Sequence, residues 1–250
     1  NAAGATHKAA VLEDLLVDHD LQILAMTETK IKDNVPDPIK FGLAPQGFSI
    51  NHVHRPGNMK GGGLAVIAAS SCIVRKHPLQ STFTSSSFEN QLINVSVGRH
   101  TVLIVNIYRR PAGSIPEFLH DFTELLTLLL PFTNNRLLIC GDFNMPQNST
   151  DINIELSNLF DMFGFKQHVT EFTRIDPVTS RHSILDLVIT PQDSTLLSNV
   201  SVVDSHCISD HRLVLCELSL RRVKLQPHTR LVRKLRSLNR SEFETRVCES

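Results

Sequence analysis

The stretch Leu137-Leu138-Ile139-Cys140-Gly141-Asp142-Phe143-Asn144 places two polar side chains directly behind an apolar run. A short apolar run of this kind is typical of a buried strand. Side chains at strand ends lie at the rim of a sheet, where residues from several strands can converge on one site. The stretch therefore predicts a buried strand that presents Asp142 and Asn144 at one edge of a sheet.

Further strands are indicated by runs in which Val and Ile alternate with polar residues. Residues 64–69, 91–97 and 101–108 have this character, and we expect them to be adjoining antiparallel strands. The remaining candidate strands are residues 21–26, 184–190, 200–203 and 211–218.

Apolar residues at helical spacing predict helices between these strands. One helix is expected over residues 8–17 and another over residues 152–163. The clearest helix follows Ser114, because Ser114 and Glu117 form a capping-box pattern and Pro131 would end the helix. Helices interleaved with hairpin-like strands favour a layered α/β (α+β) sandwich over a strictly alternating βαβ fold.

The charge of the chain is unevenly distributed. The 250 residues carry 25 Lys and Arg against 25 Asp and Glu, but residues 221–250 hold nine basic and three acidic residues, which is a charge of +6. The rest has 25 − 9 = 16 basic and 25 − 3 = 22 acidic residues, or −6, so it is not a generally basic nucleic-acid binder. We expect one domain over residues 1–219. Residues 220–250 form a basic linker, either simply solvated or an auxiliary phosphate contact.

Cysteine usage and hydropathy restrict the class of protein. The five cysteines are an odd number without CxxC spacing, so neither a disulfide framework nor a zinc knuckle is indicated. No apolar run approaches the ~20 residues of a membrane helix, and no signal peptide is evident. We expect a soluble, intracellular protein in a reducing compartment.

Polar residues that could carry chemistry recur at the ends of the expected strands. None of them is specific alone, because Asp and Asn are frequent turn residues. They are Asn1, Glu28 in Thr27-Glu28-Thr29, the pair Asp142 and Asn144, Asp186 in Ile184-Leu185-Asp186-Leu187, and Asp210 and His211 after Ser209.

The order of these motifs, with Tyr108 between the second and the third, resembles the endonuclease/exonuclease/phosphatase superfamily over residues 1–219. Within it the sequence is similar to endonuclease domains of non-LTR (LINE-type) retrotransposons. The motifs that carry this similarity are Asn1, Gly61-Gly62-Gly63-Leu64-Ala65-Val66, Ile107-Tyr108-Arg109-Arg110-Pro111, Phe172-Thr173-Arg174 and His182-Ser183-Ile184-Leu185-Asp186-Leu187-Val188-Ile189-Thr190. The resemblance implies two mixed, largely antiparallel β-sheets flanked by helices.

The residue types also suit hydrolysis of a phosphodiester. That reaction needs charge neutralisation, a nucleophilic water and a stabilised leaving group. Hard oxygen ligands suit Mg²⁺ or Mn²⁺, which keep several waters. The candidate metal ligands are Asn1, Glu28, Asp142, Asn144 and Asp210.

The resemblance implies a role for each site residue. Glu28 would be the principal metal ligand, while Asp142 would orient or deprotonate the attacking water and Asn144 would position it. His211 would touch the scissile phosphate, with Asp186 as the partner that fixes its tautomer. Tyr108, the only tyrosine of the chain, would bond the phosphate. Separately, we expect DNA phosphate contacts from Arg55, Arg109 and Arg174.

The resemblance implies a metal-dependent enzyme that nicks DNA in the nucleus and leaves a 3′-hydroxyl to prime reverse transcription. The resemblance extends to the basic tail, which such elements use to reach a reverse transcriptase domain. Three alternatives remain open: an abasic-site repair endonuclease, a phosphatase acting on small substrates, and a decayed domain that only binds DNA or partners. The sequence starts at Asn1, where the family has a preceding strand, so we expect an unfilled position in a sheet.

Overall fold

The computed structural model describes residues 1–55, 61–133, 136–145, 154–205 and 208–220. Its contacts divide the chain into two units, Asn1–Leu220 and Arg221–Ser250. The second unit lies outside the described residues, so the basic linker stays a prediction. Within the described part, no helix is long and apolar enough to cross a membrane.

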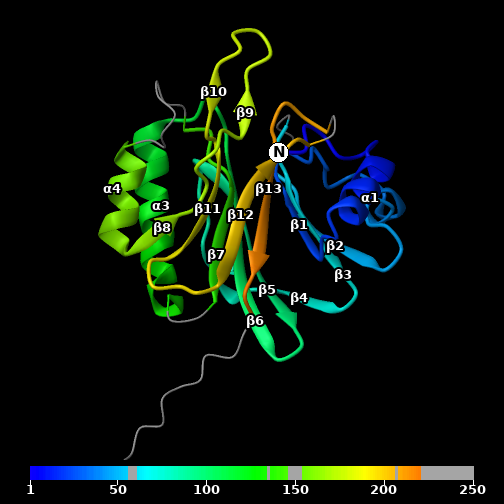
Figure 1. Cartoon of the computed structure of the whole chain (residues 1–250), viewed down its shortest axis with the longest axis horizontal. Coiled ribbons are helices and arrows are strands. Elements are labelled where there is room, and N and C mark those ends of the chain that lie inside the picture. Colours follow the sequence, from blue (N-terminus) through cyan, green and yellow to red (C-terminus); the bar gives the residue numbers. More distant parts are fainter. Residues whose placement is uncertain (56–60, 134–135, 146–153, 206–207, 221–250) are drawn as a thin grey trace, which may run out of the picture. The chain divides into compact units, whose positions relative to one another are not determined.

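The largest sheet of the first unit has the strand order β4-β5-β6-β7-β11-β8 (Figure 1). Among the described strands of this sheet, only β6 and β7 pair in parallel. Such a pair requires a crossover, and α3 (Ile115–Leu129) supplies it. The strands are β4 (Cys72–Lys76), β5 (Phe88–Val97), β6 (His100–Arg109), β7 (Leu137–Asp142), β8 (Phe165–Gln167) and β11 (Asp186–Pro191).

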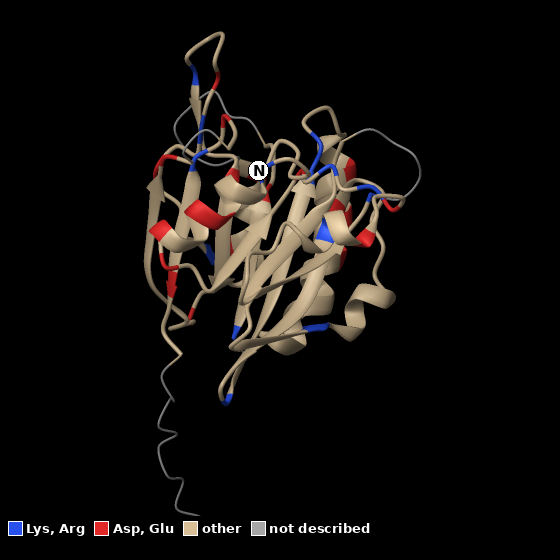
Figure 2. Cartoon of the chain, turned by 90° about the vertical axis from the view of Figure 1, so that its right-hand side faces the viewer, with Lys and Arg blue, Asp and Glu red and all other residues tan. Residues whose placement is uncertain are grey.

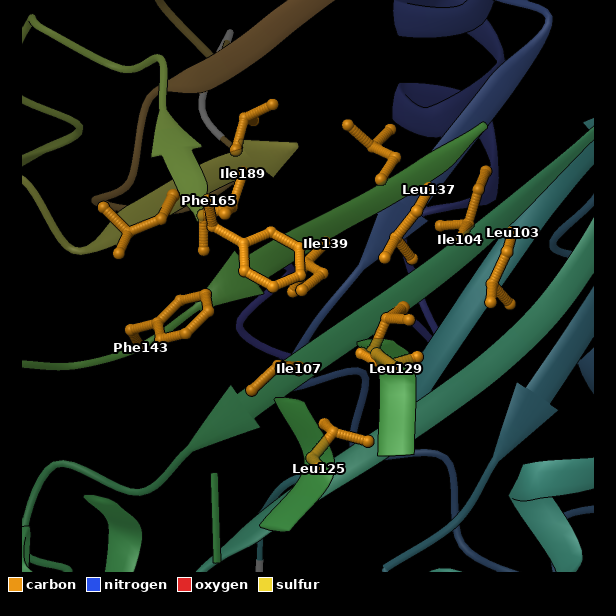
Figure 3. Close-up of a cluster of buried hydrophobic side chains, with 14 of the residues drawn as sticks. Leu103, Ile104, Ile107, Leu125, Leu129, Leu137, Ile139, Phe143, Phe165 and Ile189 are labelled. Atoms are coloured by element: carbon orange, nitrogen blue, oxygen red, sulfur yellow. The ribbon is translucent and has the colours of Figure 1, made fainter. Parts of the chain in front are cut away.

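Helices α3 and α4 (Ile154–Phe163) lie along one face of this sheet (Figure 1). Ser114 begins α3 as expected, since its Oγ accepts a hydrogen bond from the backbone N–H of Glu117. Side chains of α3 and of the sheet belong to one buried cluster (Figure 3). This cluster makes the sheet a rigid support for the residues at its rim.

A second sheet has the order β1-β3-β2 and is covered by α1 (Ala9–Asp18). Leu12, Leu15 and Leu16 of the helix are buried in a cluster with Leu24 and Ile67 of the sheet. The strands are β1 (Ile23–Met26), β2 (Phe48–Val53) and β3 (Leu64–Ala69). The remaining described elements are α2 (Asp37–Phe41), the 3-10 turns η1 (Pro78–Ser81) and η2 (Leu130–Phe132), and the hairpins β9 (Arg174–Ile175) with β10 (His182–Ser183) and β12 (Leu197–Val203) with β13 (Leu213–Leu218).

The expected α/β sandwich with mixed and antiparallel sheets is confirmed. One pairing was wrong: residues 64–69 do not adjoin residues 91–97, because β3 pairs with β1 and β2 whereas β5 pairs with β4 and β6. An alternating apolar pattern specifies a strand but not its partner. The pattern also missed α2 and the strands β2, β4, β8, β9 and β10. Residues 152–153 of the helix expected over residues 152–163 lie outside the described residues.

The edge of β1 that faces away from β3 has no strand partner among the described residues. A cavity of about 180 Å³ lies beside it and is lined by apolar side chains of β1, β7, β11 and β13. The first residues of the chain lie at one end of this cavity, which Asn1 helps to line. There the backbone N–H groups of Ala2 and Ala5 donate to the carbonyls of Thr27 and Thr29. Residues 1–5 thus run parallel to the segment after β1, and an extension before Asn1 would run along β1 itself.

We predict that a short segment of Val and Ile alternating with Thr, added before Asn1, raises the thermal unfolding midpoint. It would pair with the free edge of β1 and bury apolar surface in the cavity. The control is a Gly/Ser segment of the same length, which should leave the midpoint unchanged. Equal midpoints for the two extensions would show that the groove does not accept a strand.

Candidate active site

Three neighbouring strands bring polar side chains to one position on the sheet rim. In the parallel pair β6 and β7, Tyr108 lies opposite Asp142. In the antiparallel pair β7 and β11, Asp186 lies opposite Asp142. Tyr108, Asp142 and Asp186 therefore form a row across the sheet, although they lie far apart in the sequence.

Asp142 is the central residue of this row and is fully buried. Its carboxylate accepts hydrogen bonds from Asn1 Nδ2 at 3.0 Å and from the backbone N–H of Asn144 at 3.1 Å. Burial, together with the nearby charge of Asp186, raises the pKa of Asp142 to about 6. The carboxylate can thus accept a proton near neutral pH.

His211 and Asp186 form a buried pair beside Asp142. Their Nδ1 and Oδ2 atoms are 2.7 Å apart, and His211 Nε2 lies 4.0 Å from Asp142 Oδ2. Burial by itself would lower the pKa of His211, but the charge and hydrogen bond of Asp186 raise it above its usual range. The imidazole is therefore held in one orientation and favours its charged form.

Glu28 approaches the same rim from the other sheet, directly after β1. Its φ of +53° is unusual for a residue with a side chain, so the turn must be held by its surroundings. The hydroxyl of Tyr108 donates to Glu28 Oε1 at 3.3 Å. Burial, with the charge of Glu28, raises the pKa of Tyr108, which stays protonated as a hydrogen-bond donor.

The two predicted amides lie on either side of Asp142. Asn1 donates to Asp142 through Nδ2, while its Oδ1 accepts from the backbone N–H of Ala3 at 2.9 Å. Asn144 has a φ of +43°, and its Nδ2 donates to the carbonyl of Arg109 at 2.8 Å. Both amides are thus fixed by backbone groups.

Two of the arginines expected to contact DNA have another placement. Arg109 is 1% exposed, and its Nη1 donates to the carbonyl of Asn144 at 2.6 Å. The Arg55 side chain is 8% exposed and is paired with Glu89 at 2.5 Å. Both guanidiniums are therefore largely buried and already paired inside the protein, so DNA contact by either of them stays a prediction.

Asp210 is also separate from the central row. Its Oδ2 is 2.7 Å from Arg174 Nε, and both side chains are about one third exposed (31% and 37%). Arg174 therefore neutralises Asp210, so this carboxylate is less available to a metal than Glu28. Arg174 is the one of the three predicted arginines whose side chain is partly exposed.

Two supporting residues were missed by the sequence reasoning. Thr173 is fully buried, and its Oγ1 accepts hydrogen bonds from the backbone N–H groups of Leu185 and Asp186, each at 3.0 Å. Glu89 pairs with Arg55 across 34 positions of the chain. Thr173 belongs to the motif Phe172-Thr173-Arg174, but the motif does not show which groups its hydroxyl contacts, and Glu89 has no local motif. Only tertiary contacts give the two residues these partners.

Comparisons with known proteins show what this chain is similar to. A family described as endonuclease-reverse transcriptase matches residues 102–215. The RNA-directed DNA polymerase from mobile element jockey of Drosophila melanogaster is 24% identical over 145 residues. That match covers 58% of this chain and 14% of the polymerase, so the chain spans a small part of that relative.

Solved structures share the fold. The endonuclease domain of TRAS1, a telomere-specific non-LTR retrotransposon, superposes with a TM-score of 0.63 at 14% identity and covers 86% of this chain and 93% of its own. The AP endonuclease LMAP from Leishmania major gives a TM-score of 0.67 at 11% identity, with coverage of 86% and 85%. The 3′ phosphatase NExo from Neisseria gives 0.62 at 18% identity, with coverage of 88% and 97%.

The chain thus resembles endonuclease/exonuclease/phosphatase-type domains, and among them the endonuclease of a non-LTR retrotransposon. Basic and acidic residues are interspersed on the face of this domain shown in Figure 2.

The residues of this domain fit a hard divalent cation. Ligand atoms of Asp142, Asp186 and His211 lie within 4.8 Å of one another. His211 and Asp186 already satisfy each other, and Mg²⁺ prefers oxygen to imidazole nitrogen. Asp142 is therefore the best metal ligand of this group, with Glu28 as a further oxygen ligand at the same rim. Burial and the charge of Asp186 raise the pKa of Asp142 to about 6, and a cation would favour its ionised form.

We predict that Asp142→Asn stabilises the metal-free protein at pH 8. Because the pKa of Asp142 in the folded state lies above its ordinary value of 3.8, its stability contribution is present at low pH and lost as the pH rises through about 6. Thermal unfolding in EDTA should show a higher midpoint for the variant at pH 8 and a smaller difference at pH 5. Asp161→Asn, at an exposed position of α4, is the control; a pH-independent difference for Asp142→Asn would contradict this assignment.

Proposed function

We propose that the domain is a phosphodiesterase, dependent on Mg²⁺ or Mn²⁺, that nicks intact DNA and leaves a 3′-hydroxyl. The observation that supports it most is the row of Tyr108, Asp142 and Asp186 with His211 behind it and Glu28 facing it. These side chains offer one phosphate a base from Asp142, the positive charge of the His211 imidazolium and a hydroxyl donor from Tyr108.

In this proposal Asp142 holds the attacking water and takes its proton as a general base. The imidazolium of His211, held by Asp186, neutralises charge on a phosphate oxygen, and Tyr108 donates a hydrogen bond to the same group. Glu28 and Asp142, with the Asn1 and Asn144 amides nearby, would hold the divalent cation, which supplies charge neutralisation at the phosphate when bound.

We further propose that the nick primes reverse transcription of a non-LTR retrotransposon in the nucleus. The match to the endonuclease-reverse transcriptase family and to the jockey polymerase supports this role. A reverse transcriptase domain in the same polyprotein would then be the partner that extends the 3′-hydroxyl. The abasic-site endonuclease is the second candidate, because LMAP has the same fold.

We predict that the protein nicks supercoiled plasmid with Mg²⁺ or Mn²⁺ and that EDTA stops the reaction. The same preparation is tested on intact plasmid, abasic plasmid and a small phosphomonoester. The 3′-hydroxyl is detected when a DNA polymerase extends the nick with a labelled nucleotide. Binding should weaken with salt, because phosphate contacts release counterions.

Asp142→Asn is the matched control for this assay and should lower the nicking rate by at least ~10²-fold, as general bases contribute that much. Cleavage of the abasic plasmid alone would support the repair endonuclease. Hydrolysis of the small ester alone would support a phosphatase, and no hydrolysis at all would mean a non-catalytic domain.

We predict that Asp186→Asn and His211→Ala are not additive. The two side chains bond to each other at 2.7 Å, so each should act largely through the other. The double variant should nick DNA at about the rate of His211→Ala. Rate losses that multiply in the double variant would show that Asp186 and His211 work independently.

A further inference from the structure

A buried ion pair connects two parts of the candidate site that come from different sheets. Glu89 Oε1 lies 2.5 Å from Arg55 Nε, and Glu89 Oε2 accepts a hydrogen bond from the backbone N–H of Gly63 at 2.6 Å. The side chains are only 14% and 8% exposed. A single carboxylate thus joins β5, the end of β2 and the beginning of β3.

The Arg55 side of this ion pair reaches Tyr108. The guanidinium lies over the tyrosine ring, 5.7 Å from its centroid, where a cation is attracted to the ring face. Glu89 is also the register partner of Tyr108 in the antiparallel pair β5 and β6. Glu89 therefore fixes Arg55, and Arg55 restricts the ring whose hydroxyl points at Glu28.

The Gly63 side of the ion pair reaches Glu28. The carbonyls of Gly62 and Gly63 accept hydrogen bonds from the backbone N–H groups of Lys30 at 2.7 Å and Thr29 at 3.1 Å. These bonds hold the turn in which Glu28 has a positive φ. A Cβ on Gly62 would overlap Glu89 and Arg55, so this glycine is required for the close approach.

We infer that Glu89 is a positioning residue that holds Tyr108 and Glu28 at the distance at which both can act on one phosphate. The inference rests on the proposed function, in which these two groups meet the same substrate. A buried ion pair adds little net stability, because desolvation offsets most of the attraction between its charges. Its main effect here is geometric, since it fixes two side chains on two sheets relative to each other.

The chain contains a built-in reporter of this geometry. Tyr108 is the only tyrosine and there is no tryptophan, so the intrinsic fluorescence of the protein comes from this one residue. A phenol that donates a hydrogen bond to a carboxylate emits weakly, and a buried phenol is poorly accessible to acrylamide. Both properties can be measured without metal, DNA or catalysis.

The test compares Glu89→Gln and Arg55→Lys with the wild type in EDTA. Glu89→Gln keeps the shape but removes the charge, and Arg55→Lys keeps the charge but removes the planar group over the ring. We expect brighter Tyr108 emission and stronger acrylamide quenching in both. The matched control is Glu217→Gln, which makes the same change at an exposed position of strand β13 and should leave emission unchanged.

Nicking is measured on the same variants. Glu89→Gln should lower the single-turnover rate at saturating DNA by about tenfold to a hundredfold, as small misplacements of catalytic groups do, with DNA affinity unchanged. In a Tyr108→Phe background the additional loss should be smaller, because Glu89 acts partly through Tyr108.

The outcomes separate this inference from the proposed function. If the wild type does not nick DNA, the proposed function fails, whereas the fluorescence still decides whether Glu89 positions Tyr108. Wild-type emission and quenching in both variants would overturn the inference even if nicking is normal. A lower thermal midpoint with unchanged emission would also overturn it, because the pair would then only stabilise the fold. If Glu89→Gln does not fold, Arg55→Lys decides by the same measurements.

Discussion

The hydrogen-bond register between β6, β7 and β11 is the constraint on which the rest of the site depends. It places Tyr108, Asp142 and Asp186 opposite one another on adjacent strands. A shift of one residue in either pairing would turn the affected side chains to the other face of the sheet. The register is maintained by the apolar residues of the same strands, which are buried against α3, so the core determines where the polar side chains lie.

The charges of the site are then balanced within a small buried volume. Asp142 and Asp186 repel each other, and His211 compensates mainly the second of them, so their pKa values shift in opposite directions. Because their pKa values differ, the two similar carboxylates can have different chemical roles, as paired ionisable groups in enzymes commonly do. A metal near Asp142 and Glu28 would complete the balance.

A shell of buried groups holds this site in position. Arg109 fixes the backbone at Asn144, Thr173 fixes the start of β11, and Glu89 with Arg55 fixes Tyr108. Arg55 and Arg109 belong to this shell, whereas the sequence alone indicated a surface role for both. Their burial shows that a positive charge near this site need not face a ligand, because it can instead satisfy carbonyl and carboxylate groups behind the site.

The sequence by itself determined the α/β class, most of the strands and the cap of α3, because these follow from apolar periodicity and local hydrogen bonding. It also singled out Glu28, Asp142, Asp186 and His211, since acidic and imidazole residues at strand ends in this order form a recognisable set. Only the tertiary structure decided that β3 lies in a different sheet from β5 and β6, that Asp210 is neutralised by Arg174, and that Glu89 pairs with Arg55. Those outcomes depend on strand partners and on contacts between residues distant in the chain, and no local pattern encodes them.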